Sequence, residues 1–261
     1  MHAAAVVLSP HPDDAVFSAW AALTAQPAPL VVTVFAGVPE PGFVTSLDRS
    51  HGATESAAWV RRRRREDAAV LGEAGCDVVH GDLPDLQYRL RSVPELAAVV
   101  ETEPGRLLPL SRDEPALHVG PQAVDGVTGA LLGPSTVVHA PVGIGGHPDH
   151  EAVARYAVTL VGRVGEVRLY ADSPYYVRDG LPGWIDGSGA EDGAVAGAFA
   201  RLGVSPEGAK RRIVRHDDVA MAAKDRAMRG YRTEFDPVNE DFGGAAADHR
   251  LMRHEVYWTL R

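Results

Sequence analysis

The stretch that decides the fold lies near the N-terminus and reads AAAVVLSPHPDD over residues 3–14. Its first six residues are apolar, which is typical of a short buried strand. The residues that follow, 15–25, have the apolar spacing of a helix. His11, Asp13 and Asp14 therefore lie where a strand gives way to a helix, and open α/β proteins place their chemistry at such junctions.

A second motif with the same residue types occurs in the second half of the chain. It reads HPDH over residues 147–150, after an apolar run (135–140) and at the start of a helical pattern (148–161). Histidine nitrogen and carboxylate oxygen are both ligands of Zn²⁺. Two such clusters in matching strand-to-helix positions predict one metal site assembled from both.

The spacing alone leaves the division of roles open. His11, Asp14, His147 and His150 could all bind an ion, which would close the site, or one of them could be free to act on a substrate. Asp13 is then placed beside the ion, suited to deprotonate a bound water. The plain alternative is a His-Pro-Asp turn in which Asp14 caps a helix.

Strand-like and helix-like segments alternate along the rest of the chain. Further strands are expected at 30–36, 76–80, 166–171 and 255–258, and helices at 59–73, 94–103 and within 214–230. This alternation predicts one α/β domain over residues 1–261, with a Rossmann-like, mostly parallel sheet flanked by helices and a site at the carboxyl ends of the strands. The loops 37–57, 104–134 and 172–189 are expected to line the pocket.

The composition of the chain argues against nucleic acids and membranes as its binding partners. The 261 residues carry a net charge of −9 and a pI of about 5.6, which argues against a nucleic-acid surface. The basic run 61–65 is expected to be a solvated helix face with one arginine pointing inward. One cysteine, no signal peptide and no run of about 18 apolar residues predict a cytoplasmic protein that does not enter a membrane.

The sequence resembles the PIG-L/LmbE-like zinc-dependent N-deacetylases. The segments that carry the resemblance are SPHPDD (9–14), RRRED (63–67), LPDLQYR (83–89), APVGIGGHPDH (140–150) and YADSPY (170–175), with a fainter match over 224–234. Within the family, the run before His147 is closest to members that act on N-acyl amino sugars in antibiotic and natural-product pathways.

The resemblance implies a role for each residue of the two motifs. It implies one Zn²⁺ ion bound by His11, Asp14 and His150, with Asp13 as the general base. It implies that His147, as an imidazolium, stabilises the oxyanion or protonates the leaving amine, and that Asp149 orients it. The implied reaction is hydrolysis of an N-acyl amide on an amino sugar or a glycosylated small molecule.

Two further residues carry over from the family as substrate contacts. Arg63 matches an arginine that lines the pocket, and Asp85 matches an acid that binds sugar hydroxyls. Two positions depart from the family pattern, because Ala15 stands where many members have Glu and Gly145 where some sugar deacetylases have Tyr. The alternatives are an amidase acting on a thiol conjugate or an N-acyl amino acid, and a metal-binding protein without catalysis.

Overall fold

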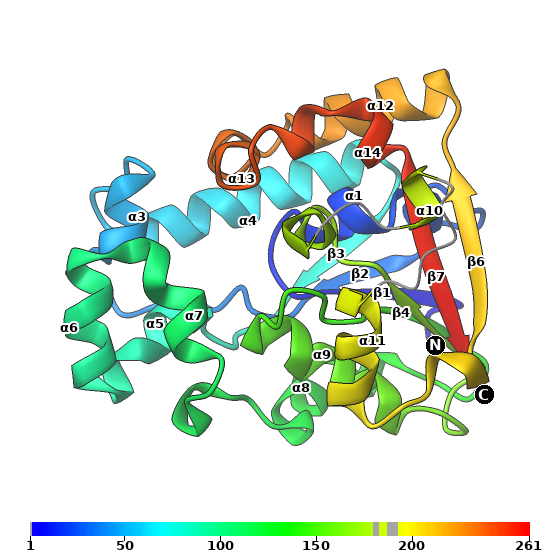
Figure 1. The fold of residues 1–261 in the computed structure, drawn as a ribbon, viewed down its shortest axis with the longest axis horizontal. Coiled ribbons are helices and arrows are strands. Elements are labelled where there is room, and N and C mark those ends of the chain that lie inside the picture. The colour runs from blue at the N-terminus through cyan, green and yellow to red at the C-terminus, as the bar shows by residue number, and fades with distance from the viewer. Residues whose placement is uncertain (1, 180–182, 187–192) are drawn as a thin grey trace.

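The computed structural model describes residues 2–179, 183–186 and 193–261, and its strands form one sheet of seven in the order β3-β2-β1-β4-β5-β7-β6 (Figure 1). The strands are β1 (Ala5–Ser9), β2 (Leu30–Thr33), β3 (Asp77–His80), β4 (Val137–Pro141), β5 (Glu166–Tyr170), β6 (Lys210–Arg215) and β7 (His254–Leu260). Strands β1 to β5 run parallel, whereas β7 is antiparallel to both β5 and β6. The predicted mostly parallel sheet is confirmed.

The central strands are valine-rich because both faces of the sheet are covered. Val7 of β1 pairs with Val31 of β2 and with His139 of β4, and both valines are fully buried. Alternate side chains of β1 enter different cores: Val6 and Leu8 pack on one face and Val7 on the other.

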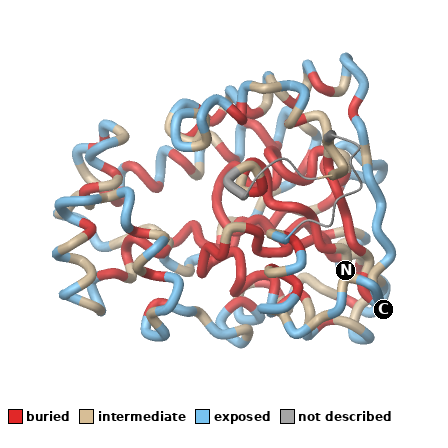
Figure 2. Tube along the Cα trace, in the orientation of Figure 1, coloured by how far each residue is buried: buried red, intermediate tan, exposed pale blue. Residues whose placement is uncertain are grey.

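Helices cover the two faces and also form a lobe at one end of the sheet (Figures 1 and 2). The α-helices are α1 (Asp14–Ser18), α2 (Trp20–Leu23), α3 (Ser46–Ser50), α4 (Ser56–Glu73), α5 (Leu86–Arg89), α6 (Pro94–Thr102), α7 (Leu107–Ser111), α8 (Pro121–Thr128), α9 (Pro148–Thr159), α10 (Gly183–Asp186), α11 (Gly193–Leu202), α12 (Asp218–Met228), α13 (Phe235–Asp241) and α14 (His249–Met252). Helices α8, α9 and α11 lie on one face, and α1, α2, α4 and α12 on the other. The lobe contains α5 to α7 and has a small core of its own. In the described part of the chain, no helix combines the length and apolarity needed to cross a bilayer.

The helix expected over residues 15–25 is in fact broken into α1 and α2. The backbone turns at Ala19, which has φ −135°. The carboxylate of Glu255, in the last strand, accepts hydrogen bonds of 2.9 Å from the amides of Trp20 and Ala21 and so caps the second helix. The prediction of one continuous helix was wrong. The local sequence does not reveal the break, because the carboxylate that caps α2 belongs to the last strand.

Two other expectations need correction. The loop expected around 37–57 contains the short helix α3, and strand β6 was missed because its residues are mostly charged and exposed. Part of the loop expected over 172–189 lies outside the described residues.

Strand order places the crevice of the fold between β1 and β4. These strands are neighbours, but the chain continues from β1 to β2 on one side and from β4 to β5 on the other. Ligands of open α/β sheets bind at such a reversal, outside the carboxyl ends of the strands. The first His/Asp motif begins two residues after β1 ends, and the second follows β4 after a five-residue turn over 142–146.

Candidate active site

The first motif is a tight turn between β1 and α1. The hydroxyl of Ser9 donates to the carbonyl of His11 (2.7 Å) and accepts from the amide of Ala15 (3.0 Å), which closes the turn. Asp13 has φ 107°, a strained value for a residue with a side chain. Its side chain makes no capping bond to α1, although it occupies the N-cap position. The alternative in which Asp14 caps the helix is wrong for a different reason: Asp14 is the first residue of α1, and its Oδ2 accepts the amide hydrogen of His11 at 2.8 Å.

The structure brings His11, Asp14 and His150 together. The Asp14 Oδ2 atom lies 3.2 Å from His11 Nδ1 and 3.2 Å from His150 Nε2, and all three side chains are buried. Burial alone would raise the pKa of Asp14, but the adjacent His150 and His11 outweigh it and lower this pKa far below its ordinary value. The arrangement stabilises positive charge next to the Asp14 carboxylate.

Each of the two histidines has a carboxylate behind its other ring nitrogen. His11 Nε2 lies 3.0 Å from Asp149 Oδ2, and His150 Nδ1 lies 2.7 Å from Asp172 Oδ1. Asp172 is fixed in turn by the amides of Gly143 and Ile144, at 2.8 and 2.9 Å. Metal-binding histidines characteristically donate their second N–H to a carboxylate, which aims the free lone pair at the ion.

The donor set fits a divalent metal ion. His150 Nε2 is buried and makes no hydrogen bond to any described residue, and with Asp14 Oδ2 3.2 Å away it borders a space in which both atoms could bind one ion. Among the described residues a second set, His11, His147 and Asp149, also lies close enough to hold an ion. Its Asp149 carboxylate is already neutralised by Arg89 at 2.5 Å, so the set that contains Asp14 is the better cation site.

Asp13 faces the cavity beside this set. Burial raises the pKa of Asp13 well above its ordinary value, with the Asp14 and Glu234 carboxylates adding to the effect. A carboxylate with a raised pKa is a stronger base than an ordinary aspartate, which suits proton transfer near neutral pH.

His147 occupies the N-cap position of α9 and has a different environment from His150. Its Nδ1 accepts the amide hydrogen of Asp149 (3.1 Å), so the proton of the neutral ring is on Nε2. Burial lowers the pKa of His147 well below its ordinary value, and the nearby histidines lower it further. The resemblance implies an imidazolium at this position, and the environment of His147 opposes its protonation. The Asp149 carboxylate contacts His11 and Arg89, and the residue reaches His147 through its backbone.

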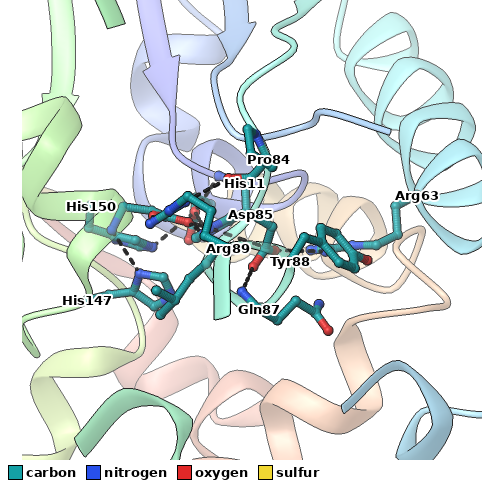
Figure 3. A network of polar contacts seen from close by, with 12 residues as sticks. His11, Arg63, Pro84, Asp85, Gln87, Tyr88, Arg89, His147 and His150 are labelled. Atoms are coloured by element: carbon teal, nitrogen blue, oxygen red, sulfur yellow. Dashed lines mark hydrogen bonds and ion pairs between the residues drawn. The ribbon is translucent and has the colours of Figure 1, made fainter. Parts of the chain in front are cut away.

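A cavity of about 470 Å³ opens above these residues. Arg63 and Asp85 both line it, with 3.5 Å between Arg63 Nη1 and Asp85 Oδ2 (Figure 3). Arg63 Nε lies 2.8 Å from Glu234 Oε1. Arg63 is the inward-pointing arginine of the basic run, as predicted. Burial, together with Asp85, raises the pKa of Glu234 to about 7 although Arg63 opposes this.

Aromatic and glycine residues surround the second motif. Tyr175 lines the cavity and packs edge-on against His150, whereas Tyr176 and Trp184 pack against each other. A Cβ atom at Gly145 would lie 2.7 Å from the Tyr175 ring, so Tyr175 covers the position where some sugar deacetylases have Tyr. The glycine run before His147 acts as a turn whose first amide is used by Asp172.

Sequence reasoning missed three residues of the site. Asp172 follows β5, so its place at the carboxyl edge of the sheet was a usable signal. Arg89 ends α5 and joins Asp149 to the helical lobe. Glu234 reaches Arg63 from a distant segment, and Arg89 and Glu234 were assigned no role although both lie in segments that carry the family resemblance.

Comparison with known proteins gives consistent relatives. No protein-family model matches the sequence. Over 184 residues the chain is 32% identical to 2′-N-acetylparomamine deacetylase from Streptomyces fradiae, and the match covers 65% of this chain and 57% of that enzyme. The chain thus spans a little over half the length of this curated relative.

Two solved structures match over nearly the whole chain. One is a deacetylase triple mutant of the teicoplanin biosynthetic pathway, with a TM-score of 0.62 and 25% identity, covering 98% of this chain and 96% of that one. The other is the deacetylase of the A40926 pseudoaglycone, with a TM-score of 0.59 and 25% identity, covering 98% and 97%.

Proposed function

We propose that this chain, a homologue of deacetylases of the LmbE/PIG-L-like fold, hydrolyses an N-acyl amide, most simply an N-acetyl group, on an amino sugar or a glycosylated small molecule. The observation that carries the proposal is the buried His150 Nε2, which makes no hydrogen bond to a described residue and lies 3.2 Å from Asp14 Oδ2, with Asp13 next to Asp14 in the chain. A metal ion can activate a water molecule and a neighbouring carboxylate can accept its proton, and these are the two requirements of amide hydrolysis.

His11, Asp14 and His150 would hold one Zn²⁺ ion, with Asp149 and Asp172 orienting the two imidazoles. When bound, the ion polarises the amide carbonyl and lowers the pKa of water to about 7. Three protein ligands leave a position open for this chemistry. A His₂Asp set accepts several divalent ions, so the activity with each metal is part of the test.

Asp13 would act as the general base. Its carboxylate takes a proton from the attacking water, and its raised pKa allows it to hold that proton until the C–N bond breaks. The proton then passes to the nitrogen of the leaving amine, so that the products are a carboxylic acid and a free amine.

His147 would stabilise the developing oxyanion. With Nδ1 occupied by the Asp149 amide, the neutral ring has one N–H, on Nε2, to offer to the former carbonyl oxygen. Its lowered pKa keeps the ring neutral, so it acts as an uncharged hydrogen-bond donor.

The cavity lining favours an amino sugar. Asp85 and Arg63 offer hydrogen bonds to hydroxyl groups, and the carboxylates of Asp48 and Glu234 line the same cavity. The guanidinium of Arg63 is already shared between Asp85 and Glu234. A substrate with a free carboxylate, such as an N-acyl amino acid, would therefore meet repulsion here.

The decisive experiment measures acetate release from N-acetylated amino sugars, N-acyl amino acids and a thiol conjugate, with and without a chelator. We expect Asp13→Asn to keep its metal and to lose about 10²- to 10⁴-fold in kcat. Asp218→Asn, at an exposed surface position, serves as the matched control. Full activity in Asp13→Asn would remove the general-base role. Metal binding without hydrolysis of any panel member would favour the non-catalytic alternative.

A further inference from the structure

A second cavity, of about 750 Å³, lies away from the candidate active site. It is bordered by strands β5, β6 and β7, by Ala21, Ala22 and Ala25 beside α2, and by the turn over 161–165. It shares no lining residue with the candidate active site, and its size falls in the range of small-molecule sites.

Strand register gathers cationic side chains on the wall of this cavity. His139 of β4 is paired with Arg168 of β5, Arg168 with Thr259 of β7, and Thr259 with Lys210 of β6. Side chains at paired positions point to the same face of a sheet, so these four form one row across it. Arg212, two residues beyond Lys210, lies on the same face.

The positive charge in this row is poorly compensated. Arg168 pairs with Glu166, the sole acidic side chain among the described lining residues. Lys210 and Arg212 form no ion pair with any described residue. Neighbouring like charges destabilise a sheet. An anion bound between these cations would relieve their repulsion, although the chain as a whole has a net charge of −9.

His139 adds a polar group at the inner end of the row. Its side chain is 6% exposed and lines the cavity, and no described residue hydrogen-bonds its Nδ1. Burial, aided by Arg168, lowers its pKa to about 3, so it is neutral at physiological pH. A neutral imidazole can hydrogen-bond an anion without adding to the repulsion between the cations.

We propose that this rear cavity binds a phosphorylated small molecule, with Arg168, Lys210 and Arg212 as its cationic contacts and His139 as a neutral polar contact. Arginine and lysine are the usual partners of phosphate oxygens. Nothing in the proposed deacetylation uses this cavity, so the inference is independent of that function.

The test is calorimetric titration of the metal-loaded protein with fructose 1,6-bisphosphate at low ionic strength, where charge pairs are least screened. Unphosphorylated fructose is the neutral control. We expect saturable binding of the bisphosphate, weakened about tenfold or more in Arg168→Gln/Arg212→Gln and weakened less in Lys210→Gln. Arg106→Gln/Arg250→Gln removes the same charge from exposed ion pairs elsewhere and should bind like the unaltered protein.

Lys210→Gln keeps the test informative if loss of the Arg168–Glu166 pair destabilises the fold, because Lys210 is exposed and unpaired. Equal weakening in both double variants would overturn the proposal, since it would indicate attraction by net charge alone. Absence of saturable binding would also overturn it and would leave these cations as protection of the exposed β6 edge. Binding that disappears in His150→Ala would place the ligand at the metal site and contradict the proposal.

Discussion

His147 and His150 begin the same helix, one turn apart, yet the protein surrounds them differently. His150 has the Asp172 carboxylate behind Nδ1 and the Asp14 carboxylate before Nε2, and these outweigh burial and raise its pKa to about 9. His147 has a backbone amide at Nδ1, and burial lowers its pKa. The carboxylate neighbours, not the position in the motif, give the two imidazoles opposite pKa shifts.

The largest expected effect comes from His147. In His147→Gln we expect kcat to fall about 10²- to 10³-fold, because one donor to the oxyanion is lost, while the metal content is unchanged. The measurements are steady-state kinetics and metal analysis of the purified variant. Loss of the metal together with the activity would contradict this prediction, because it would mean that His147 contributes to metal binding as His150 does.

The carboxylate behind His150 provides the next test. In Asp172→Asn we expect the affinity for Zn²⁺ to fall about 10- to 100-fold, because the His150 imidazole is no longer oriented by a charged partner. At saturating metal kcat should largely recover, which a competition titration with a chromophoric chelator and kinetics at rising zinc would show. Asp125→Asn, which alters a carboxylate bonded to Tyr156, is the control and should leave the affinity unchanged.

A smaller effect is expected on the side of the first motif. Arg89 holds Asp149 at 2.5 Å, and Asp149 holds His11 Nε2 at 3.0 Å, so Arg89 orients a proposed ligand through one intermediate. We expect Arg89→Met to weaken zinc binding about tenfold, measured by the same titration. The control is Arg91→Met, which removes a guanidinium stacked on Phe43. If both variants bind zinc alike, Arg89 has no part in positioning His11.

The smallest effect is on stability in chelator-treated protein. Because the pKa of His147 is lowered on folding, its contribution is present above pH ~6.5 and is lost as the pH falls below that value. Because the pKa of His150 is raised, its contribution is present below pH ~6.5 and is lost as the pH rises through about 9.

Urea unfolding across this pH range should therefore change in opposite senses in His147→Gln and His150→Gln. Each difference from the unaltered chain should be on the order of 1 kcal/mol. Shifts of the same sign in both variants would contradict the environments described for the two rings.

Much of this arrangement could be predicted from local sequence, and the remainder could not. The strand-to-helix position of both motifs follows from apolar periodicity, which is why His11, Asp14, His147 and His150 could be expected to meet, whereas the choice of three of them as ligands came from the resemblance. The resemblance to N-deacetylases is confirmed by the relatives, whereas the roles of the individual site residues stay predictions.

The residues that eluded prediction act over long sequence distances. Glu255 breaks a helix that begins near residue 14, and Arg89 and Glu234 reach the site from other elements. The contact between the Asp149 carboxylate and His11 could not be predicted either, because these residues are far apart in the sequence and meet only in the folded chain. Local sequence patterns predict which residues share a turn, but they do not predict which side chains from distant segments bind to that turn.

The most direct test of the account is the metal content of His147→Ala and His150→Ala, each purified in parallel after zinc loading and shown to be folded by circular dichroism. The account predicts about one zinc per chain in His147→Ala and close to none in His150→Ala. The reverse result, with zinc retained in His150→Ala and lost in His147→Ala, would contradict the assignment of His11, Asp14 and His150 as the metal site.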